Sequence, residues 1–143
     1  MGCFKLPVDQ IQPSQLYISR DKLTKVNKYL KTTAYSQPEL LPVKRIGDLV
    51  FFTDGHTRAL ALWEQGLAEL DVYLDQDDLD WLQYLICVQW CQDLGVHQIR
   101  DLSNRIVDHL EYERLWYDRC AQMQNAVKRG FYEGVGIRQV TEH

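Results

Sequence analysis

The stretch at residues 41–66, LPVKRIGDLVFFTDGHTRALALWEQG, decides the fold of this 143-residue chain. Residues 41–46 predict a strand, and Gly47 before Asp48 predicts a type II′ hairpin turn, because glycine tolerates a positive φ. The continuous apolar run at 49–52 is typical of a strand covered on both faces. A helix follows and ends near Gly66, where a C-cap glycine belongs.

The polar junction between the second strand and this helix, TDGHTR at residues 53–58, is the candidate functional site. A helix N-terminus exposes unpaired backbone N–H groups at the positive end of its dipole, which suits an anion. The alternative is an ordinary capped loop with Thr53 or Asp54 as the N-cap. Arg58 favours the anion site, because an arginine in the first turn opposes the helix dipole.

The sequence DGHTRALAL after a hairpin resembles the ParB/sulfiredoxin superfamily. In ParB-like free serine kinases the equivalent junction reads Asp-Gly-His-His-Arg, which this chain matches except for Thr57 in place of the second histidine. Sulfiredoxin has a cysteine where His56 stands, so its chemistry is not expected. The resemblance covers roughly the first half of the chain. It implies an α+β fold built on a small mixed sheet with helices, and the residues after 75 predict a C-terminal helical layer that follows it.

The N-terminal segment fits the same pattern. Residues 4–8 predict a first strand, and Ser19 is a good N-cap for a helix. Leu23, Val26 and Leu30 of that helix form one apolar stripe. The lysines off this stripe predict a solvated face; the functional alternative is a basic rim beside a phosphate site, with Arg20 nearest. These lysines stand at positions 22, 25, 28 and 31.

Strict alternation at residues 69–74 predicts a half-exposed strand that closes the sheet. Its inward set is Leu70, Val72 and Leu74, and its outward set is Glu69, Asp71 and Tyr73. A segment rich in aspartate follows, and Asp77 or Asp78 is expected to be the N-cap of the next helix. That helix is apolar on most sides and ends at Gly95.

The C-terminal half predicts further helices. Residues 96–107 are irregular, with a helical turn at 98–102. Asp108 and Glu111 match a capping box for the last helix. That helix carries apolar residues at steps of four, four and three, namely Tyr112, Trp116, Cys120 and Met123. The predicted organisation is a core at 1–75, a helical extension packed on it at 76–128, and a loose tail at 129–143.

Composition predicts one compact domain with no secretory signal or transmembrane span, and hence a soluble cytoplasmic protein. The cysteines at 3, 87, 91 and 120 include no CxxC pair, so we expect reduced core thiols and no metal site. His97 and His109 are expected at the surface or in caps.

Charge is divided unevenly along the chain. Residues 1–63 hold nine Lys/Arg and five Asp/Glu, and residues 64–143 hold seven and fifteen. An anionic ligand would meet a favourable field in the first half, which contains DGHTR. The acidic second half disfavours specific DNA binding, and a helix-turn-helix at 90–106 would place several aspartates near phosphates.

The first functional hypothesis is a nucleotide-binding domain that takes ATP, ADP or CTP with Mg²⁺, with small-molecule kinase activity as an extension. Backbone N–H groups from Gly55 onward would hold phosphate oxygens, Arg58 would pair with a phosphate, and Thr57 would donate its hydroxyl. His56 would act as a donor or general acid/base, and Asp54 would orient it or hold Mg²⁺. The metal is expected only with the nucleotide.

Turnover has less support than binding. The kinases that this chain resembles use a glutamate shortly after the first proline of the domain, and Ser14 and Gln15 stand there. The nearest carboxylates in sequence are Asp9 and Asp21. The second hypothesis is a non-catalytic partition or regulatory module whose Trp-rich helices dock a partner or a second copy, giving a homodimer. A nuclease has no support, since the basic half lacks a carboxylate cluster for two metals.

Overall fold

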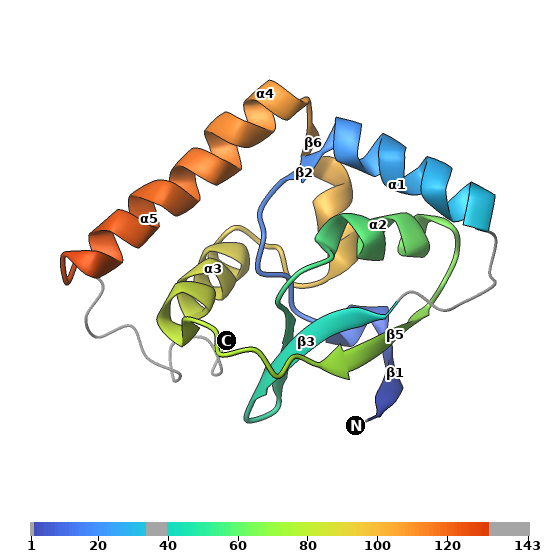
Figure 1. Ribbon diagram of the computed structural model, residues 1–143, viewed down its shortest axis with the longest axis horizontal. Coiled ribbons are helices and arrows are strands. Elements are labelled where there is room, and N and C mark those ends of the chain that lie inside the picture. The colour runs from blue at the N-terminus through green and yellow to red at the C-terminus, as the bar shows by residue number, and fades with distance from the viewer. Residues whose placement is uncertain (1, 34–39, 132–143) are drawn as a thin grey trace.

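The computed structural model describes residues 2–33 and 40–131, and it has the predicted α+β fold, with a mixed four-stranded sheet and helices (Figure 1). The strands lie in the order β1 (Cys3–Pro7), β5 (Glu69–Leu74), β3 (Leu41–Ile46) and β4 (Leu49–Phe52). The parallel pairing is between β5 and β3, whereas β1–β5 and β3–β4 are antiparallel.

The predicted hairpin joins β3 to β4. Ile46 pairs with Leu49, so Gly47 and Asp48 form a two-residue turn, and Gly47 has a φ of 55°. The side chains of Phe51 and Phe52 are both fully buried, as expected of a strand covered on both faces. Phe51 packs with α3, whereas Phe52 belongs to the main core. The buried end of β4 therefore fixes the position at which the DGHTR junction begins.

The prediction for β5 was right for its first part and wrong at its end. Leu70 and Val72 are buried and Tyr73 is exposed, but Leu74, which alternation placed in the core, is 44% exposed. The reason is that β1 begins at Cys3, opposite Tyr73, so Leu74 has a strand on one side only, at Val43. The strand also does not close the sheet, because it lies between β1 and β3.

In Figure 1 the helices lie above the sheet and to its left. They are α1 (Arg20–Thr33), α2 (His56–Glu64), α3 (Trp81–Asp93), α4 (His109–Tyr112), α5 (Asp118–Lys128) and the 3-10 helices Val8–Gln10 and Ile99–Asn104. A π-helical segment, Glu113–Tyr117, joins α4 to α5, and the three run as one continuous rod in Figure 1. The 3-10 helix at 99–104 replaces the turn predicted at 98–102.

A second, two-stranded sheet connects the two halves of the chain. It pairs β2 (Ile18–Ser19) in parallel with β6 (Ile106–Val107). Beside it, the Arg105 Nε donates a hydrogen bond to the Leu16 carbonyl at 2.7 Å. The Gln12 side chain reaches the Val96 carbonyl at 2.8 Å. The N-terminal loop and α1 are thus held against the C-terminal helices, an arrangement that local sequence patterns do not encode.

Helix caps agree with prediction in part. Ser19 Oγ accepts from the Lys22 N–H, and Gly66 has the positive φ of a C-cap glycine. Asp77 and Asp78 were wrong as caps of α3, because its N-cap is Asp80, whose carboxylate accepts from the Gln83 N–H. That later start brings Trp81 to the first turn of α3.

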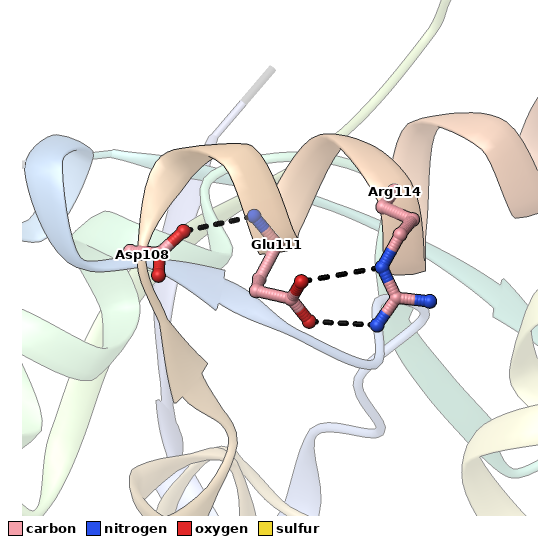
Figure 2. Close-up of polar contacts among 3 residues, drawn as sticks. All are labelled: Asp108, Glu111 and Arg114. Atoms are coloured by element: carbon pink, nitrogen blue, oxygen red, sulfur yellow. Dashed lines mark hydrogen bonds and ion pairs between the residues drawn. The ribbon is translucent and has the colours of Figure 1, made fainter.

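The start of α4 shows half of the predicted capping box (Figure 2). The Asp108 carboxylate accepts from the Glu111 N–H at 2.9 Å. The Glu111 carboxylate accepts instead from the Arg114 guanidinium, at 3.2 and 2.7 Å. An arginine three residues along the helix offers it two donors, which outweighs the one backbone N–H of a capping box.

Within residues 2–33 and 40–131, no helix has the length and apolar character needed to cross a membrane. Most of the tail predicted at 129–143 lies outside the described residues.

Candidate functional site

The DGHTR junction begins α2 without a side-chain cap. The N-cap is Gly55, in the left-handed conformation with φ 79° and ψ 19°, so Thr53 and Asp54 were wrong as N-caps. Thr53 Oγ1 donates to Asp75, while the Asp54 carboxylate accepts from the Gly55 N–H at 2.7 Å. The next three backbone N–H groups, of residues 56–58, have no acceptor among the described residues. An uncapped helix N-terminus of this kind attracts negative charge.

Arg58 folds back toward this N-terminus. A Cβ placed on Gly55 would lie 2.9 Å from the Arg58 Nη2 and 2.9 Å from the Leu41 Cδ2, so the guanidinium rests against the glycine backbone. Gly55 is therefore needed both for its positive φ and for this close approach. No described residue forms an ion pair or hydrogen bond with the Arg58 guanidinium. A forked cation and three free N–H groups thus meet at one point.

His56 is buried, with 4% of its surface exposed, and its ring packs edge to face with the Phe52 ring. Its Nε2 accepts a hydrogen bond from the Ser14 backbone N–H at 2.9 Å. Burial lowers the pKa of His56 to about 4, although the Asp54 carboxylate opposes that shift. At neutral pH the ring is therefore uncharged and carries its proton on Nδ1. His56 can donate a hydrogen bond from Nδ1, but its Nε2 is occupied and cannot serve as a base.

These residues line a cleft of about 490 Å³ between α1, α2 and the C-terminal rod. It is walled by three cations, Lys22, Lys25 and Arg58, against one carboxylate, Asp54. Since His56 is neutral, the walls carry a net positive charge. The remaining lining residues are Gln15, Val26, Gly55, His56, Thr57, Tyr112, Trp116 and Tyr117.

The π-helical segment shapes the far wall of the cleft. Lys22 Nζ lies 5.0 Å from the centre of the Tyr112 ring and 5.1 Å from that of Tyr117, and it donates to the Tyr117 hydroxyl. A π-turn bonds residues five apart, so it brings Tyr112 and Tyr117 to the same side of the rod, which a regular α-helix would not do. The two rings meet edge to face at 4.9 Å. Lys22 is held in place by these cation–π contacts.

A second cavity of about 200 Å³ adjoins the cleft, sharing Gln15, Asp54, His56 and Trp116 with it. Its other walls are Ser14, Thr53, Gln83, Tyr84, Cys87, Cys120, Met123 and Gln124. Ser14 Oγ donates to the Phe52 carbonyl at 2.7 Å, and Gln15 Nε2 to the Tyr17 carbonyl and the Tyr112 hydroxyl. The two residues that stand in place of the expected glutamate thus lie at the site, as neutral groups.

The structure brings together most of the sequence-predicted site. Residues 54–58 all line the cleft, whereas Arg20 does not: it points to the Ile106 carbonyl at 3.4 Å. Lys22 and Lys25 line the cleft in place of Arg20. Tyr112, Trp116 and Tyr117 had no sequence signal for this role beyond their spacing. Among the described residues no group of three or more His, Cys, Asp or Glu side chains could hold a metal ion.

Comparison with protein-family models and with curated proteins finds no match. Among solved structures, the chain is similar to the crystal structure of protein Atu1540 from Agrobacterium tumefaciens, with 15% identity and a TM-score of 0.47. The match covers 67% of this chain and 50% of that one, so the chain spans about half the length of its structural neighbour.

Proposed function

We propose that this protein binds a phosphate-bearing small molecule, a nucleotide such as ATP, ADP or CTP, at the N-terminus of α2. The observation that carries the proposal is the unpartnered Arg58 guanidinium folded over Gly55 at an uncapped helix start, inside a cleft lined by further cations. Each of these features alone has a structural explanation. Their coincidence at one point matches the needs of a phosphate group.

The terminal phosphates lie against the backbone N–H groups of residues 56–58, with the guanidinium of Arg58 as a fork. The His56 Nδ1–H and the Thr57 hydroxyl add neutral donors, and Lys22 and Lys25 face the same cleft as point charges. Tyr117, which is 42% exposed, offers a flat apolar surface on which a base can stack.

Binding is the primary activity, and phosphoryl transfer is an extension of it. A kinase needs a group that positions or deprotonates the acceptor, and Asp54 is the one carboxylate among the lining residues of both cavities. Its Oδ1 already accepts from the Gly55 N–H, which leaves Oδ2 for a Mg²⁺ ion that arrives with the nucleotide. His56 then stabilises phosphate charge as a donor and does not act as the base.

The experiment is a thermal-shift series with ATP, ADP, CTP and GTP, each with and without Mg²⁺. A cognate ligand at about 100 times its dissociation constant should stabilise the protein by roughly 2.7 kcal/mol. The matched variants are Arg58→Ala, which removes the fork, and Lys28→Ala, which removes an exposed lysine of α1 that does not line the cleft.

The shift should disappear in Arg58→Ala and persist in Lys28→Ala. If no nucleotide shifts the melting temperature of the wild type, the nucleotide proposal is wrong, and a non-catalytic interaction module becomes the better account. A shift that survives Arg58→Ala would place the ligand elsewhere.

A further inference from the structure

Two cysteines from different helices meet in the wall of the smaller cavity. Cys87 lies on α3 and Cys120 on α5, helices that contact one another, and both side chains line the space of about 200 Å³. Each thiol shifts the pKa of the other, so the two side chains lie near one another. Cys87 is buried and Cys120 partly exposed, so one sulfur is accessible and the other stands behind it. Both are free thiols, and the remaining cysteines, Cys3 and Cys91, do not line this cavity.

The surroundings shift the pKa values of the two thiols in opposite directions. The neighbouring Cys87 thiol lowers the pKa of Cys120, burial opposes that shift, and the Arg119 guanidinium lowers the pKa further. The same contact, together with burial, raises the pKa of Cys87. Arg119 packs over the Trp90 ring at 4.2 Å, and its buried Nε has no hydrogen-bond partner among residues 2–33 and 40–131. Within the described part of the chain this cation has no carboxylate partner, and the raised pKa keeps the Cys87 thiol protonated.

We propose that Cys87 and Cys120 form a redox-active dithiol whose substrate is a small hydroperoxide. The Cys120 thiolate attacks the peroxide oxygen and breaks the O–O bond, giving a sulfenic acid and water or an alcohol. The Cys87 thiol then displaces hydroxide, which leaves as water, and a Cys87–Cys120 disulfide forms. Two thiols lose two electrons and two protons, and one hydroperoxide is reduced.

The product would link α3 to α5 across the cavity that adjoins the cationic cleft. That bond would add a covalent link to the packing that already holds Tyr112, Trp116 and Met123 of the C-terminal rod in the main core. The inference does not depend on the nucleotide proposal, because none of its residues lines the cationic cleft.

The test treats fully reduced protein with hydrogen peroxide and maps disulfides by mass spectrometry of peptides. The wild type should lose 2 Da, located to a peptide pair containing Cys87 and Cys120. Cys91→Ser is the matched control, because Cys91 is buried one turn along α3 from Cys87. It and Cys3→Ser should behave as the wild type. Cys87→Ser should leave a sulfenic acid on Cys120 that dimedone traps.

Loss of the 2 Da change in Cys120→Ser, with no dimedone adduct at Cys87, completes the expected pattern. The inference is overturned if peroxide leaves Cys87 and Cys120 reduced while it oxidises Cys3. It is equally overturned if the disulfide joins Cys91 to Cys120, or if dimedone labels Cys87 rather than Cys120 in the single variants.

Discussion

At the scale of single residues, His56 shows why chemistry cannot be assigned from a motif alone. The sequence offers an imidazole beside an arginine, which suggests acid/base catalysis. In the structure the His56 Nε2 accepts a hydrogen bond from the Ser14 backbone N–H, and the ring is buried. The side chain is therefore a fixed neutral donor. The residue type was predictable, but its protonation state depends on a loop 42 positions away in sequence.

This environment predicts a pH dependence of stability. The folded-state pKa of His56, about 4, lies below the ordinary histidine pKa of 6.5, so the unfolded state binds the proton more readily. The contribution of neutral His56 to the free energy of unfolding is complete above pH 6.5. It falls by about 3 kcal/mol in total as the pH drops toward 4. Urea unfolding of the wild type and His56→Gln across this range should show a steeper loss in the wild type. An NMR titration in which His56 protonates near pH 6.5 would contradict the argument.

Arg58 is predicted to serve a ligand more than the fold. It has no partner in the described part of the chain, and it lies at the positive end of a helix dipole. Arg58→Ala should therefore leave the melting temperature of ligand-free protein unchanged or slightly higher. Arg58→Lys should restore only part of the nucleotide-induced shift, because an ammonium group cannot form the fork. A drop of many degrees in the ligand-free melting temperature of Arg58→Ala would show that Arg58 is structural.

At the scale of elements, periodicity predicted α1 and most of β5, because each buries one regular face, whereas the hairpin was predicted from its glycine turn and its continuous apolar run. Prediction failed where a neighbouring strand ends, as at Leu74, and where one of several aspartates must be chosen as cap, as at Asp80. Periodicity also did not predict the π-helical segment Glu113–Tyr117, whose Trp116 packs in the main core.

The two faces of β5 give a matched test. Val72 is fully buried between β1 and β3, whereas Glu69 is exposed at the start of the strand. Val72→Asp should prevent folding, because it buries an unpaired charge, and Glu69→Lys should be nearly neutral. Circular dichroism and thermal melting decide the matter. Similar melting temperatures for the two variants would mean that the packing of β5 is misassigned.

The cap of α4 gives a second test at this scale. Asp108→Ala removes the acceptor of the Glu111 N–H, and it should lower the free energy of unfolding by about 1 kcal/mol. Arg114→Ala breaks the exposed ion pair drawn in Figure 2 and should produce no measurable change. Chemical denaturation of both variants checks the difference. A larger loss in Arg114→Ala than in Asp108→Ala would reverse the assignment.

At the scale of the whole molecule, charge favours one cavity over another. A separate cavity of about 470 Å³ is also lined by two arginines, Arg100 and Arg105. Arg105 is already engaged, since its Nε bonds the Leu16 carbonyl and its guanidinium lies 4.6 Å from the Tyr17 ring centre. Asp101 adds a carboxylate there. The DGHTR cleft differs because its guanidinium and its backbone N–H groups are unused by the fold.

Only the cleft residues that belong to one continuous motif could be predicted from the sequence. Residues 54–58 were identifiable because they interrupt a buried strand and a helix with polar groups. The other half comes from Lys22 on α1 and Tyr112 and Tyr117 on the C-terminal rod, which meet the motif only through tertiary packing. Their approach depends on the pairing of β2 with β6, two-residue strands too short to leave a pattern in the sequence.

The most direct test of the central claim is a titration of ¹⁵N-labelled protein with the nucleotide that gives the largest thermal shift, followed through backbone amide resonances. We predict that the amides of His56, Thr57 and Arg58 shift most, because their N–H groups gain phosphate acceptors. The amides near Arg100 and Arg105 should stay in place. Saturating shifts around Arg100 and Arg105, with residues 56–58 unmoved, would contradict an anion site at the start of α2.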